Sequence, residues 1–483
     1  MIAELQPYPA YEDSGVPWLG TIPAGWEMRR NGRLFAQRNQ TGFARLPILE
    51  VSLKTGVRVR DFDSATRKQV LSDKDKYKRA CCGDVAYNMM RLWQGAVGVA
   101  PVDGLVSPAY VVARPLAETN ARYFEYVFRT DSYKSEINKF SRGIVSDRNR
   151  LYWEDFKQMP SPVPPLEAQA AIVRFLDHAD RRIRRYIRGK QKLIALLNEQ
   201  KQAIIHSAVT RGLDPNVRLK PSGVEWLGDV PEHWRAVRLK QVAAVQTGIT
   251  LGKNYGVRPL VARPYLRVAN VQTGRLSLDR ITTTRVPVRE AEGSTLQPGD
   301  VLMTEGGDID KLGRGCVWRG EIPECLHQNH IFAVRPNQGV LLPEFLVGLM
   351  ASRHGRTFFE ITAKKTTNLA ATNSTTLRCF PLWLPEVEEQ EHILRWTRER
   401  VASLDSTATR AESEASLMRE YRTRLIADVA TGKLDVREVA AKLPAEADEP
   451  ESPDIADVSE DGSEDAGDAE DADLDQVDQT AQA

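Results

Sequence analysis

The sequence predicts an α+β fold in which two similar α/β domains are separated by two long helices that pack as an antiparallel coiled coil. The first observation is a repeat: the pattern Ser-Gly-Val-x-Trp-Leu-Gly-x-x-Pro-x-x-Trp occupies residues 14–26 and returns with identical spacing at residues 222–234. Secondly, a long helical pattern follows each copy. Thirdly, 483 residues exceed what one ordinary hydrophobic core accommodates. We therefore expect an internal repeat with pseudo-two-fold symmetry.

The two domains, expected over residues 1–165 and 214–386, share an order of elements. Short strands around a turn come first, followed by a Gly-Asp-Val strand, a buried strand closed by Arg-Pro, and a helix with one apolar face. The matching segments are Leu46–Asp61 with Tyr265–Gly274, Gly83–Val85 with Gly299–Val301, Val111–Pro115 with Phe332–Pro336, and Phe124 and Phe128 with Phe345 and Leu349. The offset between copies is 208 at the opening pattern, 216 at Gly-Asp-Val and 221 from Arg-Pro onward, which predicts one frame with different loops.

The long helices are predicted over residues 166–213 and 387–436, where Gln169 and Gln390 occupy matching positions near the start. Each helix of about 44 residues would be roughly 65 Å long. A heptad-type frame reads Ile172, Leu176, Ala179, Ile183, Tyr186, Lys190, Leu193, Leu197, Gln200 and Ile204 in the first helix, and Ile393, Thr397, Arg400, Leu404, Thr407, Ala411, Glu414, Met418, Tyr421 and Leu425 in the second. We expect the apolar positions of this frame to pack the helices against each other. Docking of each helix on its own domain is the alternative.

The charge is distributed unevenly along the chain. Residues from Pro444 onward hold 16 of the 65 Asp and Glu side chains and no Lys or Arg. Residues 1–443 therefore combine 66 basic with 49 acidic side chains, a net charge of +17 that favours a polyanionic partner. Residues 437–483 are predicted to form a disordered acidic tail, favoured as a solvating segment over a mimic of nucleic acid.

Composition excludes several classes of protein. No apolar run reaches the roughly 18 residues that cross a bilayer, and the N-terminus lacks a secretory pattern. The five cysteines are odd in number and poorly spaced for zinc or for disulfides. We expect reduced thiols and a cytoplasmic location.

No motif for catalysis is recognisable. The chain has no Gly-x-x-x-x-Gly-Lys-Ser/Thr loop and no Asn/Asp-Pro-Pro-Tyr/Phe string of the kind that amino-methyltransferases use. His327 and His330 have only Cys325 nearby as a third metal ligand, so a metal site there is disfavoured. The carboxylates of the glycine-rich loop Thr304–Gly315 could serve a two-metal nuclease, but a loop that reads bases or closes a turn is favoured.

Basic side chains interleaved with aromatic and amide side chains suit DNA, because Arg and Lys neutralise phosphates while Arg, Asn, Gln and Glu can read base edges. Such groups occur in loops at corresponding places of the two copies. The candidates are Lys54, Arg58, Arg60, Arg91, Trp93, Gln94, Arg142, Ser146 and Arg148 in the first domain, and Glu305, Asp308, Lys311, Arg314, Lys364, Lys365, Thr367 and Asn368 in the second.

These features together resemble the specificity subunit of type I restriction–modification systems. The resemblance covers about residues 10–436 and rests on the duplicated opening pattern, the Gly-Asp-Val strands, the Glu-x-Gln start of each long helix, and the Thr-Gly-Lys-Leu-Asp end of the second helix. The loop Thr304–Gly315 is similar to a recurring loop of one class of target recognition domain. The first domain departs from this pattern, since it carries Tyr87–Gly95 at the equivalent place, and the role of that loop cannot be transferred to it.

The resemblance implies a subunit without catalysis of its own that reads a bipartite, asymmetric DNA site. Two target recognition domains would each read one half-site, and the two helices would fix the spacing. Methyltransferase subunits would supply the S-adenosylmethionine chemistry, and an ATP- and Mg²⁺-dependent restriction and translocase subunit would complete a defence against foreign DNA. The alternatives are a stand-alone DNA-binding or scaffold protein with a coiled-coil dimerisation rod, and a metal-dependent nuclease.

Overall fold

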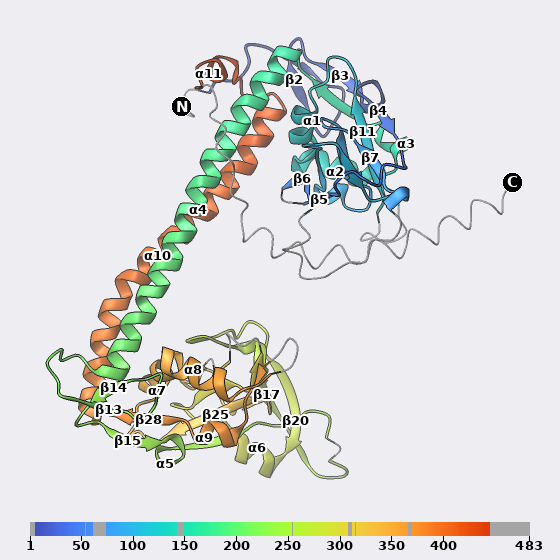
Figure 1. Ribbon diagram of the computed structural model, residues 1–483. Helices are drawn as coiled ribbons and strands as arrows, with labels where there is room; N and C mark the ends of the chain where they lie inside the picture. The colour runs from blue at the N-terminus through green and yellow to red at the C-terminus, as the bar shows by residue number, and fades with distance from the viewer. Residues whose placement is uncertain are drawn as a thin grey trace. The chain divides into compact units, whose positions relative to one another are not determined.

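The computed structural model describes residues 5–53, 55–60, 74–142, 149–253, 255–307, 312–313, 315–365 and 370–444 (Figure 1). The chain divides into two compact units. Unit 1 holds Met1–Arg188 together with Ala415–Ala483, and unit 2 holds Gly189–Glu414. Each unit therefore contains the start of one long helix and the end of the other. The expected mixture of helices and sheets, with a long helix from Leu166, is confirmed.

Unit 1 is built around a four-stranded antiparallel sheet of order β4-β11-β8-β9. Its strands are β1 (Tyr11–Asp13), β2 (Thr21–Pro23), β3 (Glu27–Arg30), β4 (Phe35–Arg38), β5 (Leu49–Ser52), β6 (Gly56–Val59), β7 (Lys78–Ala80), β8 (Val85–Asn88), β9 (Val97–Val99), β10 (Gly104–Val106), β11 (Tyr110–Pro115) and β12 (Pro160–Val163). Its helices include η2 (Asn31–Arg33), η3 (Lys74–Lys76), η4 (Leu92–Gln94), α1 (Ala121–Phe128), α2 (Asp131–Phe140), α3 (Trp153–Phe156) and α11 (Arg437–Ala441). Aromatic rings of the sheet and helices form much of the core, as where Phe35 meets Phe124 edge-on with 5.4 Å between ring centroids.

Unit 2 repeats this arrangement with a four-stranded antiparallel sheet of order β16-β25-β21-β23. Its strands are β13 (Leu219–Pro221), β14 (Asp229–Pro231), β15 (Arg235–Arg238), β16 (Ala243–Thr247), β17 (Leu260–Leu266), β18 (Val271–Gln272), β19 (Arg275–Leu276), β20 (Thr282–Pro287), β21 (Val301–Thr304), β22 (Gly306–Gly307), β23 (Gly315–Val317), β24 (Leu326–His327), β25 (Ile331–Pro336), β26 (Lys364–Lys365), β27 (Ala370–Ala371) and β28 (Pro381–Leu384). Its helices include α5 (Leu239–Val242), η5 (Val268–Asn270), α6 (Val288–Ser294), α7 (Pro343–Ala351), α8 (Arg353–Thr362) and α9 (Ser374–Arg378). The expected match between Leu46–Asp61 and Tyr265–Gly274 holds only in part, because η5 interrupts the second segment.

The duplicated opening pattern folds in the same way in both units. Ser14 N–H donates to Gly20 O at 2.9 Å, and Ser222 N–H donates to Gly228 O at 3.1 Å. The last tryptophan of each copy lies in the core, Trp26 with 4% and Trp234 with 1% of its surface exposed. The repeat is thus a structural frame that anchors the start of each domain.

The Gly-Asp-Val carboxylate of each unit accepts hydrogen bonds from an arginine of the central sheet. Asp84 accepts a hydrogen bond of 2.6 Å from Arg38 Nε on β4. Asp300 is buried and accepts two hydrogen bonds of 2.7 Å from Arg335 on β25. The two matching carboxylates therefore accept from arginines on strands that do not correspond in the two units. The match between the two sequence segments does not predict this difference.

The two matching glutamines tie each domain to a long helix. Gln169 accepts from Asn120 N–H at 2.8 Å and donates to the carbonyl oxygens of Glu118 at 3.1 Å and Pro164 at 2.9 Å. Gln390 makes the same set in unit 2, accepting from Leu342 N–H at 2.9 Å and donating to the carbonyl oxygens of Val340 at 2.8 Å and Pro385 at 3.0 Å. Because both side chains are at least 99% buried, these hydrogen bonds satisfy groups that water does not reach.

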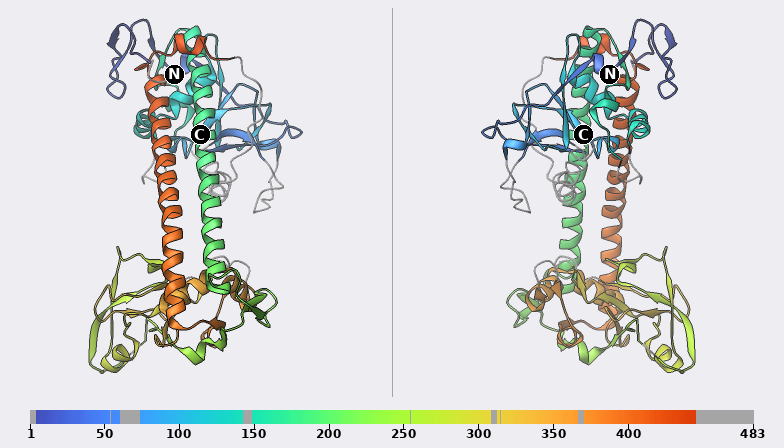
Figure 2. Two further views of the ribbon diagram at one scale, coloured as in Figure 1. Left: turned by 90° about the vertical axis from the view of Figure 1, so that its left-hand side faces the viewer. Right: turned by 90° about the vertical axis from the view of Figure 1, so that its right-hand side faces the viewer.

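The long helices α4 (Leu166–Arg211) and α10 (Val387–Ala430) run antiparallel within each unit (Figures 1 and 2). In unit 1, Asp180 accepts a hydrogen bond from Arg422. In unit 2, Lys190 Nζ lies 2.6 Å from a Glu414 carboxylate oxygen, and Lys201 Nζ lies 2.6 Å from one of Asp405. As the residue number rises on one helix, the number of its partner falls on the other.

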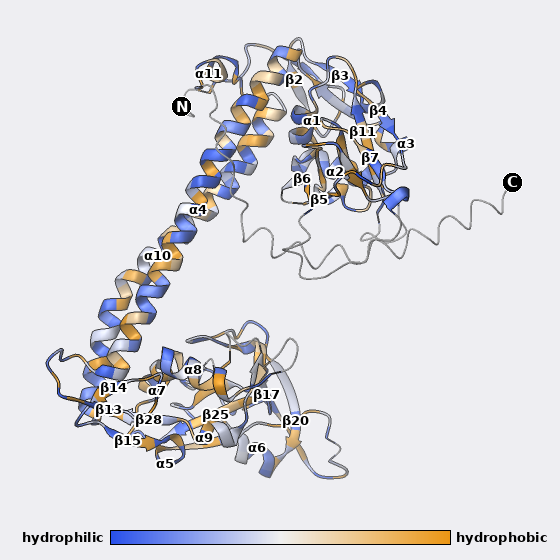
Figure 3. Ribbon diagram, viewed as in Figure 1, coloured by the Kyte–Doolittle hydropathy of each residue, from blue (hydrophilic) through white to orange (hydrophobic). Residues whose placement is uncertain are grey.

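The burial along the helices corrects several positions of the expected frame by one residue. Ala179 is buried as the frame named it, together with its neighbour Asp180, whereas Ile187 is buried where the frame named Tyr186, which is 42% exposed. Ile194 is half-buried whereas Leu193 is exposed. On α10 the buried positions are Val401, Ala408 and Ala415 where the frame named Arg400, Thr407 and Glu414. The two helices carry polar and apolar residues close together (Figure 3), and steps of three and four residues fit this sequence almost equally well, so only the folded helices distinguish them.

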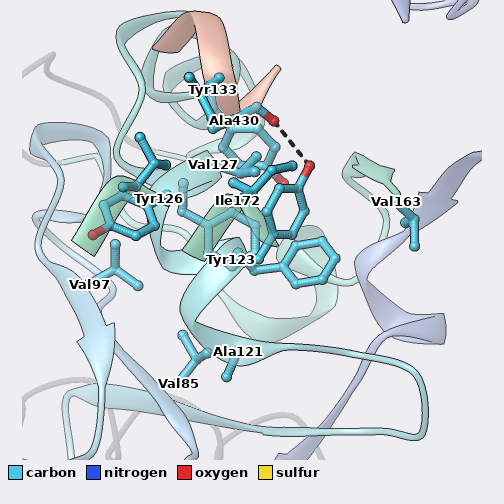
Figure 4. Packing of buried hydrophobic residues seen from close by; sticks show 14 of the residues in the cluster. Val85, Val97, Ala121, Tyr123, Tyr126, Val127, Tyr133, Val163, Ile172 and Ala430 are labelled. Atoms are coloured by element: carbon cyan, nitrogen blue, oxygen red, sulfur yellow. Dashed lines mark hydrogen bonds between the residues drawn. The ribbon is translucent and has the colours of Figure 1, made fainter. Parts of the chain in front are cut away.

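The ends of the helices also belong to the domain cores. Of the expected packing residues, Ile172, Leu176, Ile183 and Leu425 are buried in the core of unit 1 and Ile393 in that of unit 2, while Leu197, Ile204, Leu404 and Met418 are half-buried. Tyr123 donates to the carbonyl oxygen of Ala430, the last residue of α10, at 3.0 Å (Figure 4). The ends of α4 and α10 thus dock on the domain core of each unit, which is the alternative that the sequence left open.

The C-terminal boundary differs from the expected one. Residues 437–441 form α11, and Ala440 and Leu443 are buried in the core of unit 1. A tail beginning at residue 437 is therefore wrong, because this segment has apolar side chains to bury. The acidic residues after Pro444 lie outside the described residues, and their disorder stays a prediction. No helix in the described part of the chain is both long enough and apolar enough to cross a membrane.

Candidate nucleic-acid interface

In unit 2 the structure brings two of the predicted loops together. The strand β22 directly follows Glu305 and pairs with β27, with Gly306 opposite Ala371. The strand β27 pairs in turn with β26, where Lys364 lies opposite Ala371. The two lysines of β26 are exposed. Residues 58 positions apart in sequence, Gly306 and Lys364, thus belong to one small sheet that presents two positive charges beside a glycine-rich loop.

Glu305 lies at the centre of this arrangement. Its Oε2 atom is 2.6 Å from Nδ1 of His330, the residue just before β25. Its backbone N–H donates to His330 O at 2.9 Å, and its own carbonyl oxygen accepts from Thr372 N–H at 2.9 Å. The side chain of Glu305 is 29% exposed and that of His330 56% exposed. A carboxylate and an imidazole that are held in place yet open to solvent can accept from and donate to base edges.

Unit 1 brings together the corresponding pair of loops. The backbone N–H of Leu151 donates to Met89 O at 2.8 Å. This bond places Leu151 beside Met89, the residue that follows β8. Arg142 and Arg150 pair as an antiparallel bridge, and the exposed Arg142 side chain donates to Asp155 Oδ1 at 2.5 Å.

The two tethers are equivalent. Met89 lies 216 positions before Glu305, and Leu151 lies 221 positions before Thr372, which are the offsets of the repeat at these places. The same backbone hydrogen bond therefore joins the same two loops in each domain. The loops themselves differ in sequence, with Met-Met-Arg-Leu-Trp-Gln after Asn88 and Glu-Gly-Gly after Thr304. A shared frame thus supports two different surfaces.

The other candidates of unit 1 are placed as follows. Gln94 is exposed, whereas Arg91 is half-buried. Trp93 packs partly against the core and donates from Nε1 to Met90 O at 2.9 Å, so most of its ring serves the fold. Gly95, with φ of +102°, ends the short helix η4 in a conformation that favours glycine.

Arg58 and Arg60 are placed on the separate hairpin β5–β6. Glu50 lies opposite Arg58 in the strand register and accepts a hydrogen bond from its Nε. Arg60 Nε lies 4.0 Å from the other carboxylate oxygen of Glu50. One carboxylate thus faces two guanidinium groups, so part of the positive charge of these two arginines is committed to the fold.

Eight of the seventeen candidate residues lie outside the described residues: Lys54, Ser146, Arg148, Asp308, Lys311, Arg314, Thr367 and Asn368. Their roles stay predictions. The described ends of these loops, at Arg142, Gly307, Lys365 and Ala370, show where the loops leave the frame.

Sequence reasoning missed His330, Asp155 and Glu50. Each is the partner of a predicted residue, and the pattern offered no signal for the pairing because the partners lie 8–25 positions apart on different elements. The disfavoured trio of Cys325, His327 and His330 does not form a cluster. His327 is fully buried with Nδ1 3.0 Å from Ile331 O, while His330 is exposed. Burial lowers the pKa of His327, which favours the neutral ring. Within the described ranges no three His, Cys, Asp or Glu side chains are grouped as metal ligands.

Comparison with known proteins places this geometry in context. No protein-family model matches the chain. A putative type I restriction enzyme specificity subunit of Methanocaldococcus jannaschii is 23% identical over 171 residues, which are 35% of this chain and 40% of that protein. A second type I specificity subunit of that organism is 23% identical over 290 residues, 58% of this chain and 64% of the relative. The matches thus span less than two thirds of the length of these two relatives.

The fold of this chain is shared by a solved chain, which comes from a study of the assembly and conformational transition of the type I restriction–modification system. Its TM-score is 0.60 at 16% identity, over 85% of this chain and 98% of that chain. The resemblance to type I specificity subunits that the repeated motifs indicate is confirmed by these matches.

Proposed function

We propose that this chain is the DNA-recognition subunit of a type I restriction–modification complex and that it binds a bipartite, asymmetric site. The observation that carries the proposal is the equivalent tether in the two units, Leu151 to Met89 and Thr372 to Glu305. Each tether joins two loops of different sequence on one frame. Two such surfaces on one chain are what is needed to read two unlike half-sites.

The chemistry at each surface suits the two parts of DNA recognition. Exposed Lys364 and Lys365 can neutralise phosphates, a contact that positions the protein without reading sequence. Glu305 can accept from the exocyclic amine of cytosine, and His330, depending on its tautomer, can donate to or accept from a neighbouring base. In unit 1, exposed Gln94 and Arg142 are the corresponding groups.

The long helices would act as the spacer between the two readers. The 46 residues of α4 correspond to roughly 70 Å of helix. The ion pairs that join α4 to α10 in both units support a fixed antiparallel pair. Methyltransferase subunits and an ATP- and Mg²⁺-dependent restriction and translocase subunit are the partners in this proposal, and S-adenosylmethionine chemistry would be theirs.

Methylation sequencing tests the proposal. The chain is produced together with the candidate methyltransferase subunits of its source cell, and the methylated sites are mapped. We expect a split motif that is absent without this chain. Glu305→Gln should relax or change one half-site and leave the other intact, and an exchange of residues 46–160 should change only the opposite half. A continuous motif, methylation that does not depend on this chain, or changes in both halves would contradict the proposal.

Activity of the isolated chain tests the alternatives. Metal-dependent cleavage of DNA would favour a nuclease, and sequence-specific binding without a methyltransferase partner would favour a stand-alone DNA-binding protein. We expect neither.

A further inference from the structure

A cavity of about 350 Å³ lies in unit 1 beside the first turn of α4. Its lining combines the entry segment of the domain, the start of the helix and one residue of α11, and includes Tyr8, Gly25, Trp26, Glu167, Ala168 and Arg437. A Cβ atom added at Gly25 would meet nothing within 4 Å, and Ala168 ends at its methyl group. The cavity therefore exists because two residues of its lining are small.

The equivalent place in unit 2 holds a carboxylate. Glu389 corresponds to Ala168 at the repeat offset of 221, and Trp234 corresponds to Trp26 at the offset of 208. The Glu389 side chain accepts a hydrogen bond of 3.1 Å from Trp234 Nε1, and its other oxygen lies 2.8 Å from His233 Nε2. Unit 2 thus pairs the N–H of its buried tryptophan with a glutamate at a position where unit 1 has alanine.

Two polar groups of the cavity lining have no hydrogen-bond partner in the described part of the chain. One is Nε1 of Trp26, since the hydrogen bonds of this residue do not involve its indole N–H. The other is the hydroxyl of Tyr8, a residue with only 7% of its surface exposed. The two rings meet edge-on with 5.7 Å between their centroids. Because buried polar groups in proteins are normally hydrogen-bonded, both groups favour an acceptor that comes from outside the chain.

The surroundings of the cavity suit a negative charge. The first N–H groups of α4 have no partner within the helix, and a helix N-terminus carries a partial positive charge. Arg437 donates to Asp435 through Nε at 3.0 Å and Nη2 at 2.6 Å, which leaves Nη1 for a second acceptor. Glu167 is an exposed carboxylate of the same turn, but its counterpart Glu388 is equally exposed beside Glu389 in unit 2. A carboxylate in the cavity is therefore compatible with Glu167.

We propose that this cavity binds a carboxylate from another molecule, in the position that the Glu389 carboxylate occupies in unit 2. The bound carboxylate accepts from Trp26 Nε1, and Arg437 Nη1 supplies a second donor. Beyond the Cβ atom that Ala168 already has, a glutamate consists of a methylene and a carboxylate, so the complementary group has the size of acetate. A small carboxylate and a glutamate of another polypeptide both present this group. The inference goes beyond the proposed function and does not depend on it.

Titration with acetate tests the site directly. In the full chain labelled with ¹⁵N at tryptophan, the indole signal of Trp26 is identified by its loss in Trp26→Phe. We expect acetate to shift this signal saturably, with half-saturation at roughly 10 mM for so small a ligand. Chloride at the same ionic strength and neutral acetamide should leave the signal in place. The absence of a shift with acetate, or an equal shift with acetamide, would overturn the proposal.

Two peptides distinguish the possible sources of the carboxylate. Acetyl-Ala-Glu-Ala-amide carries its only carboxylate on a side chain, and acetyl-Ala-Gln-Ala-amide is its neutral match. Tighter binding of the glutamate peptide than of acetate assigns the site to a polypeptide partner, and a shift with acetate alone assigns it to a small carboxylate. Equal shifts with the two peptides would contradict a carboxylate site.

A carboxylate supplied from within the chain is an independent test. Ala168→Glu introduces the residue that unit 2 has at this position, and Ala168→Gln is a neutral control of the same size. We expect Ala168→Glu to slow hydrogen exchange around Trp26 about tenfold relative to Ala168→Gln and to abolish the acetate shift. Equal exchange in the two variants, or an acetate shift that persists in Ala168→Glu, would refute the proposal.

Discussion

Replacing Gln169 by leucine should loosen unit 1 and leave unit 2 intact. The leucine has a similar volume, so the main effect is the loss of three hydrogen bonds. Each lost bond costs about 0.5–1.5 kcal/mol, and a buried group left unpaired costs about 1–3 kcal/mol. One of the three bonds is fully buried and two are partly buried, which gives a loss of about 3–5 kcal/mol for Gln169→Leu.

Urea unfolding followed by hydrogen-exchange mass spectrometry measures this effect. Gln390→Leu breaks the matching set of bonds in unit 2, so its loss of protection should fall there instead. Gln200→Leu is the control, because Gln200 is exposed on α4, and a surface change of this kind costs within about 0.5 kcal/mol. If Gln169→Leu behaves like this control, or if either variant loosens both units equally, the buried amides do not tie each domain to its helix as inferred.

Three further outcomes follow from single features of the structure. The double change Lys364→Gln and Lys365→Gln should weaken binding of the assembled complex to all duplexes alike. If both lysines contact phosphates, the slope of log affinity against log salt concentration should fall in magnitude by about 2 in anisotropy titrations. A loss confined to one sequence would show that they read bases instead. Gly432→Ala should destabilise unit 1 by about 1–3 kcal/mol more than Gly20→Ala in urea unfolding. Both glycines have positive φ, but only at Gly432 would the new Cβ meet Pro23 Cδ at 2.5 Å, so equal losses would argue against that close packing. Burial of Asp180 opposes its ionisation, but the hydrogen bond and charge of Arg422, together with Arg184, hold the pKa of this carboxyl below its ordinary value. The ion pair of Asp180 therefore stabilises unit 1 above the unfolded pKa of about 3.9. This stabilisation is lost as the pH falls through the lower pKa of the folded state. Unfolding of Asp180→Asn should depend less on pH in that acidic range, and an unchanged pH profile would contradict the assignment.

The frame of this protein could be predicted from its residue pattern. The duplicated opening pattern predicts two domains of one design, and both copies fold with the same hydrogen bonds and a buried tryptophan. The matching Gln169 and Gln390 mark the start of the two long helices. The two glutamines occupy matching positions of the repeat, which predicts that their side chains have similar surroundings. Both accept a hydrogen bond from a backbone N–H of their own domain.

Which residues contact each other depends on the folded chain. The pairs Glu305 with His330 and Arg142 with Asp155 join elements whose local patterns are independent of each other. The seam of α4 and α10 was ambiguous in sequence because steps of three and of four both offer apolar positions. In unit 1 the hydrogen bond from Arg422 to Asp180 identifies one position at which the two helices meet. Periodicity is a property of one segment, whereas a contact depends on two segments and the path between them, so the frame was predictable and the partners were not.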